Sequence, residues 1–141
     1  MTSLRLLLLT LLAVFSAGAL AAQQKPYAEI PVHKQSGIDY VSGGMTDDER
    51  KELGRISNKY PMQLVFIAGE NTEPIRGVKV TVRDIKGSPL IEAVADGPYF
   101  FFNPPSGRWT MDAEYGGEVV SRRVDLIGRR YILLEFKFEG E

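Results

Sequence analysis

The sequence predicts a mainly β domain, an antiparallel β-sandwich of about seven short strands preceded by one short α-helix. Two observations lead to this prediction. From residue 62 onward apolar and polar side chains alternate with a period of two, and turn residues recur about every eight to twelve residues. In the stretch 96–117, turn residues bracket an aromatic run, and a proline–glycine corner then leads into an alternating strand. This spacing favours a sandwich over a parallel α/β fold.

Residues 1–21 have the pattern of a secretory signal peptide. The single cation Arg5 precedes an apolar run from Leu6 to Phe15, and the small residues from Ala19 to Ala22 fit a cleavage site. The apolar run is shorter than the roughly 20 residues that span a bilayer, so we expect cleavage and not a membrane anchor. The expected mature protein is periplasmic or secreted and has no transmembrane segment.

Residues 22–44 are predicted to form an extended N-terminal arm, because Pro26 and Pro31 exclude a continuous helix. Within this arm, Ile38 and Tyr40 indicate a short strand. Residues 45–141 are predicted to form the helix and the sandwich. The helix is expected over 46–60, since Thr46 and Glu49 make a capping box at its start and the proline at position 61 ends it.

The strands are predicted from alternation and turn chemistry. Val78, Val80 and Val82 point to one face of their strand, and residues 84–87 form the turn of a hairpin with 90–95. Residues 62–68 form an interior strand, and the four aromatics at 99–102 are either covered on both sides or leave one face exposed. Residues 108–115, 118–126 and 130–138 supply the remaining strands, with Trp109 facing inward.

Composition excludes several functional classes. The chain has 17 lysines and arginines and 18 acidic residues, and loss of Arg5 leaves 16 and 18, a net charge of −2 that gives no footprint for nucleic acid. There is no cysteine, which excludes a disulfide framework and a thiol nucleophile. The single histidine, His33, is a poor metal site by itself. We therefore expect no catalytic residues, no metal and no cofactor, and predict that the protein is not an enzyme.

Several of these motifs resemble the carboxypeptidase regulatory-like domain over about Met62 to Phe138. The resemblance lies in the valine-rich strand 77–82, the Asp96-Gly97 pair before the aromatic run, the corner at 104–107, and Trp109 and 115–117 beyond it. It implies a transthyretin-like (prealbumin-like), seven-stranded Greek-key β-sandwich. Residues 40–44 and the helix also resemble small exported proteobacterial proteins that carry this domain. The resemblance implies turn and core roles for a structural signature of Gly97, Pro105, Gly107, Tyr115 and Gly117.

Two groups of residues are candidate binding sites. Arg122, Arg123, Arg129 and Arg130 flank the last turn and are either a solvated hairpin end or a site for an acidic partner. Tyr99, Phe100 and Trp109 are either core residues or an aromatic platform for sugar rings. The leading hypothesis is a non-catalytic exported module that contacts an unknown protein of the cell envelope. The alternative is a carbohydrate-binding module with a glycan as partner. Buried rings favour the first hypothesis and exposed coplanar rings the second.

Overall fold

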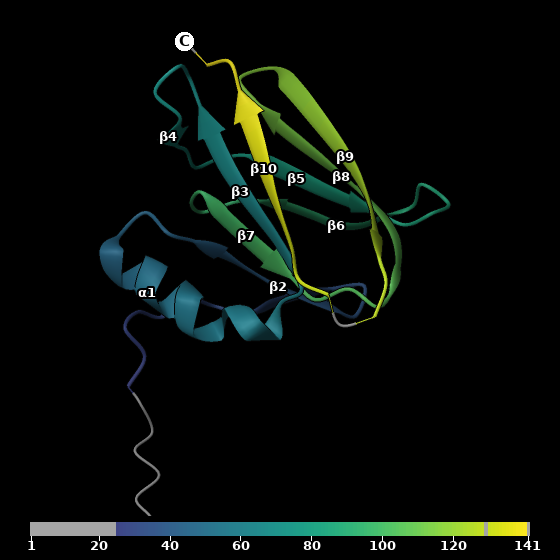
Figure 1. The fold of residues 1–141 in the computed structure, drawn as a ribbon, viewed down its shortest axis with the longest axis horizontal. Helices are drawn as coiled ribbons and strands as arrows, with labels where there is room; N and C mark the ends of the chain where they lie inside the picture. Colours follow the sequence, from purple (N-terminus) through teal and green to yellow (C-terminus); the bar gives the residue numbers. More distant parts are fainter. Residues whose placement is uncertain (1–24, 129, 141) are drawn as a thin grey trace, which may run out of the picture.

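The computed structural model describes residues 25–128 and 130–140, which form a mainly β fold with one short α-helix (Figure 1). The predicted leader, residues 1–21, lies outside the described residues. Within the described ranges there are ten strands, where the sequence predicted about seven. The elements in chain order are β1 (His33–Gln35), β2 (Ile38–Gly43), α1 (Asp47–Ile56), the 3₁₀ helix η1 (Ser57–Lys59), β3 (Met62–Ala68), β4 (Glu73–Pro74), β5 (Lys79–Arg83), β6 (Pro89–Val94), β7 (Tyr99–Phe102), β8 (Gly107–Tyr115), β9 (Glu118–Leu126) and β10 (Ile132–Phe138).

The strands form two sheets that pack on one hydrophobic core. Sheet A has the order β1-β2-β7-β3-β10, with β4 paired to β3, and sheet B has the order β6-β5-β8-β9. Phe66, Phe100 and Phe136 of sheet A are fully buried in the same cluster as Val80 and Met111 of sheet B. The predicted alternation of the β5 valines and of β8 is therefore confirmed, because their inward side chains make up much of this core.

The pairing of β10 corrects the prediction of a purely antiparallel fold. β10 lies parallel to β3, from Ile132 opposite Met62 to Phe138 opposite Ala68. β9 belongs to sheet B and β10, the next strand in the chain, to sheet A, and β10 starts at the same end of that sheet as β3. The alternation of side chains fixes which face of a strand is buried, but it carries no information about the direction of its neighbour.

The region expected as an extended arm is more regular than the sequence predicted. β2 is an interior strand of sheet A, paired with β7 from Tyr40 opposite Phe102 to Gly43 opposite Tyr99. Its Ile38 and Tyr40 are buried in the common core. The short strand expected near Ile38 therefore extends to Gly43, because burial of these side chains stabilises it.

Helix α1 begins as predicted and covers one face of sheet A. Thr46 caps it: the Glu49 amide donates to Thr46 Oγ1 at 3.1 Å and the Thr46 amide donates to Glu49 Oε2 at 3.3 Å, which confirms the capping box. The α-helix ends at Ile56, and η1 carries the chain to Tyr60. Leu53 and Ile56 pack in a second buried cluster with Val41, Tyr60 and Phe101.

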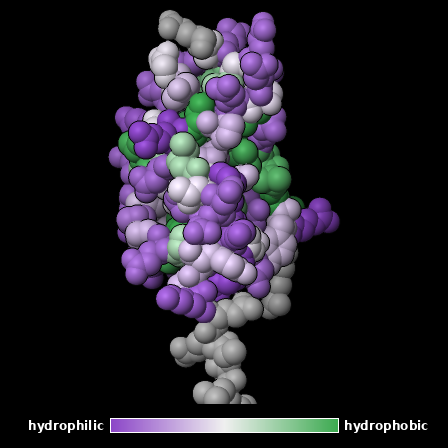
Figure 2. Space-filling model, turned by 90° about the vertical axis from the view of Figure 1, so that its left-hand side faces the viewer, coloured by the Kyte–Doolittle hydropathy of each residue, from purple (hydrophilic) through white to green (hydrophobic). Residues whose placement is uncertain are grey.

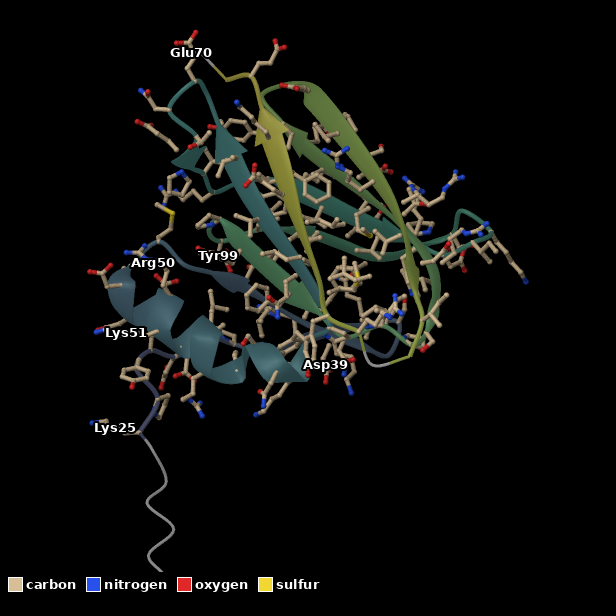
Figure 3. All side chains as sticks on the ribbon, viewed as in Figure 1. Lys25, Asp39, Arg50, Lys51, Glu70 and Tyr99 are labelled. Atoms are coloured by element: carbon tan, nitrogen blue, oxygen red, sulfur yellow. The ribbon has the colours of Figure 1, made fainter. Side chains whose placement is uncertain are left out.

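This second cluster explains the aromatic run. Phe100 and Phe102 of β7 belong to the core between the sheets, whereas Phe101 belongs to the cluster under α1. Tyr99 lies on the same side as α1 (Figure 3). Both faces of β7 are therefore covered, one by sheet B and the other by the helix.

In the part of the chain that the structure describes, no helix is both long and apolar enough to cross a membrane.

Candidate interaction surface

The candidate site lies on the side of the molecule where both sheets end (Figure 1). The last strand there is β9 in sheet B and β10 in sheet A. We call it the β9–β10 seam and define it by the core-facing side chains of the two strands that are not fully buried. These are Val120, Arg122 and Val124 of β9 and Ile132 and Leu134 of β10. A hydrogen bond connects the residue after β10 with the first residue of β9: the Glu139 amide donates to Glu118 Oε2 at 3.0 Å.

The core-facing side of β9 is incompletely covered. Val120, Arg122 and Val124 lie opposite Ala113, Met111 and Trp109 of β8. Directly opposed residues of an antiparallel pair have their side chains on the same face, so these three side chains leave β9 on the core side. The three β8 partners are at most 5% exposed, but the two valines are only half-buried and Arg122 is exposed. Sheet A therefore covers β8 more completely than β9, although Cα atoms of β10 come within 8 Å of β9.

The backbone edge of β10 is open as well. In a parallel ladder alternate residues bond to the same neighbour. The Ile132 amide donates to the Pro61 carbonyl at 2.8 Å and the Phe138 carbonyl accepts from the Gly69 amide at 3.0 Å, so the even-numbered residues bond to β3. The amides and carbonyls of Leu133, Glu135 and Lys137 then point to the other edge. Within the described residues no strand pairs with that edge.

At the opposite edge of sheet B, one side chain blocks part of the edge strand β6. Gln35 of β1 bonds twice to the backbone of β6: its Nε2 donates to the Glu92 carbonyl at 2.9 Å, and its Oε1 accepts from the Glu92 amide at 3.0 Å. The carboxamide thus occupies the position of a neighbouring strand. β1, the edge strand of sheet A, therefore lies beside β6.

Exposed apolar side chains surround the seam. Among the described residues nine large apolar side chains are exposed, and four of them lie on β9, β10 or the segment between them: Val119, Ile127, Tyr131 and Leu133. Ile127 shares a shallow hollow with Ile85 and Leu126. The side that carries α1 and β4 is largely hydrophilic, with hydrophobic residues in small separate groups (Figure 2). The surroundings of the seam are therefore suited to contact with another molecule.

The predicted arginine cluster is not formed as a unit. Arg122 leaves β9 on the core side, whereas Arg123, opposite Thr110, leaves it on the outer face of sheet B. Arg130 is exposed in the connection to β10, and Arg129 lies outside the described residues. Arg122 and Arg123 therefore do not share one face, because successive residues of a strand face opposite sides.

The three rings considered as an aromatic platform lie mostly in the interior, as the core alternative expects. Phe100 is fully buried and Trp109 is 5% exposed, with its Nε1 donating to the Pro105 carbonyl at 3.0 Å. Tyr99 is half-buried, and its ring packs so closely on Gly44 that a Cβ there would lie 2.3 Å from Tyr99 Cδ2. Stacking on a sugar needs an exposed aromatic face, and these three rings do not provide one together.

The signature residues lie in turns and at packed corners. Gly97 is buried, and a Cβ on it would lie 2.4 Å from the carbonyl carbon and oxygen of Gly43. Gly117 has a φ of 81° in the tight turn between β8 and β9, a conformation that favours glycine. Gly107 begins β8, the Pro105 carbonyl holds Trp109, and the ring of Tyr115 lies 5.6 Å from that of Phe138.

Several charged groups away from the seam are paired with each other. The hydrogen bond from Arg55 lowers the pKa of Glu52, and the Tyr27 amide adds to this effect against the opposing effect of burial. Burial by itself would raise the pKa of Asp112, but hydrogen bonds from Ser121 and Arg83 lower it overall. In the described ranges no cluster of three or more potential metal ligands occurs. Each of these groups has a structural partner that accounts for it.

Comparison with known proteins adds no family. No protein-family model matches this chain, and no curated protein matches it. The resemblance to the carboxypeptidase regulatory-like domain therefore stays a prediction.

Proposed function

We propose that this protein is a non-catalytic, exported β module that acts through protein–protein contacts in the cell envelope, and that the β9–β10 seam makes these contacts. One observation carries the proposal: both sheets end at the same side, where a half-covered core face, an open backbone edge and exposed apolar side chains occur together. Soluble domains usually cover or blunt such edges, as Gln35 does at β6. An edge that stays open is suited to a partner.

The finer fold and the location belong to the same proposal. A Greek-key, transthyretin-like sandwich is supported by the two packed sheets and by the resemblance of residues 62–138. Export to the periplasm or the medium is supported by the signal-peptide pattern of residues 1–21. A non-catalytic role is supported by the environment of the single histidine, His33, whose ring is stacked on Tyr40 with centroids 5.3 Å apart.

Position-specific crosslinking in the native envelope tests this proposal. A photo-crosslinking amino acid is placed at Leu133, beside the seam, and in a matched control at Val94 of β6. Both side chains are apolar, lie on edge strands and are similarly exposed, at 65% and 61%. We expect a discrete crosslinked protein from Leu133 and none from Val94. Crosslinking at neither position, or the same products at both, would contradict a specific contact at the seam.

A further inference from the structure

We infer that the β9–β10 seam accepts one extended strand of a partner protein, which pairs with the free edge of β10 and directs a carboxylate at Arg122. The inference rests on the proposed function and names the kind of partner segment that the site takes. The edge of β10 supplies the first requirement. Leu133, Glu135 and Lys137 each present an amide and a carbonyl on the side away from β3, and an added strand is bound through such groups.

The uncovered face of β9 supplies the second requirement. Neighbouring strands of a sheet lie about 4.8 Å apart, and Cα atoms of β10 come within 8 Å of β9, so a strand added to the free edge of β10 would lie next to β9. Its inward side chains would cover Val120 and Val124, which are now half-buried. Since a strand directs alternate residues to each face, the partner segment needs apolar residues at every second position.

Arg122 specifies one position of that segment. It lies between the two valines on the same face of β9, and among the described residues no carboxylate is within ion-pair distance of it. Covering a charged side chain without a partner is costly, whereas a carboxylate from the added strand would pair with it. The inward-facing residue opposite Arg122 is therefore acidic.

Neither a second copy nor the chain's own N-terminal segment fits as the occupant. β10 of a second copy has its inward residues Phe136 and Phe138 fully buried in its own core, so they are not free to cover β9. A second copy would also bring a second Arg122 to the same seam. Residues 1–24 contain no aspartate or glutamate and cannot supply the carboxylate.

Charge reversal on the two neighbouring arginines tests the inference. The probe is a fluorescent peptide of about eleven residues in which valine alternates with threonine and the central valine is replaced by glutamate. The control peptide has lysine at that position. We expect the glutamate peptide to bind the wild-type protein on the order of tenfold more tightly than the lysine peptide. Arg122→Glu should invert this preference, whereas Arg123→Glu, on the opposite face of β9, should retain it.

A second pair of variants tests the edge. Glu135→Pro removes an amide that faces away from β3, so it blocks the edge without removing a bond to β3, while Glu135→Ala leaves the amide in place. Thermal melts establish that each variant is folded. We expect glutamate-peptide binding to be lost in Glu135→Pro and kept in Glu135→Ala, with slower exchange of the Leu133, Glu135 and Lys137 amides on binding.

Three outcomes would overturn the inference: equal binding of both peptides, full binding by folded Glu135→Pro, or a dimer of the free protein by light scattering. The proposed function has a separate test. A specific crosslink from Leu133 together with failure of the peptide experiments would retain the protein contact and reject the added strand. Absence of the crosslink would reject the contact surface itself.

Discussion

Replacing Gly97 with alanine is expected to destabilise the protein by about 2–4 kcal/mol. An ideal Cβ at this buried position would lie 2.4 Å from the carbonyl carbon and oxygen of Gly43, whereas ordinary contacts begin near 3.4 Å. The two backbones would have to separate by about 1 Å, the difference between these distances. The obstacle is main chain of β2 and not a flexible side chain, so it cannot move aside without disturbing the β2–β7 pairing.

The magnitude combines two effects of this separation. Overpacking at a well-packed site costs about 1–3 kcal/mol. The nearby hydrogen bond from the Asp96 amide to Ser42 Oγ, now 3.1 Å long, would weaken, at a cost of about 1 kcal/mol. The matched control is Gly54→Ala, since Gly54 is exposed in α1 with no atom within 4 Å of a Cβ, and it should gain about 0.5–1 kcal/mol.

Urea unfolding followed by tryptophan fluorescence measures both variants against the wild type. A Gly97→Ala protein within about 0.5 kcal/mol of the wild type would refute the close approach of Gly97 to Gly43. Destabilisation of both glycine variants by the same amount would show a general effect of alanine and would equally refute the reasoning.

Trp109→Ala removes the single tryptophan, so its urea unfolding is followed by circular dichroism; it should lose about 3–5 kcal/mol, because a buried ring and its hydrogen bond to Pro105 are removed, and a fully stable variant would contradict the inward orientation of Trp109. Thr46→Ala should lose about 1 kcal/mol through the missing helix cap, and unchanged stability would contradict the capping box. The pKa of Asp112 is lowered in the folded state, so its charge stabilises the protein above about pH 4 and this contribution is lost as the pH falls through the lowered value. The stability difference between wild type and Asp112→Asn, measured by denaturant titration across this range, should therefore shrink with acidification, and a difference independent of pH would contradict the assignment.

Local features of this fold follow from the sequence because they depend on neighbouring residues. The capping box of Thr46 and Glu49 lies within four positions, and the valines of β5 show their buried face by alternation alone. The inward orientation of Trp109 follows in the same way. Each of these depends on the geometry of a single element, which local sequence specifies.

Long-range arrangement could not be predicted in the same way. The parallel pairing of β3 and β10 joins residues about 70 positions apart in the chain, and neither strand encodes the direction of its neighbour. The need for glycine at position 97 was expected from a turn, but it arises from contact with Gly43, which is brought there by the pairing of β2 with β7.

The candidate site was predicted in part. The sequence drew attention to Arg122 as a member of a basic group, yet its partners and setting come from the fold. The separation of Arg122 and Arg123 was present in the sequence, since adjacent residues of a strand face opposite sides. The open edge of β10 was not, because it depends on where sheet A ends relative to sheet B.

Hydrogen exchange along β10 in the free protein tests most directly whether this edge is open. The amides of Ile132, Leu134, Phe136 and Phe138 face β3 and should exchange slowly, whereas those of Leu133, Glu135 and Lys137 should exchange quickly. We expect this alternation, residue by residue, in backbone exchange measured by NMR. Uniformly slow exchange along β10 would contradict it, because the edge would then already be covered.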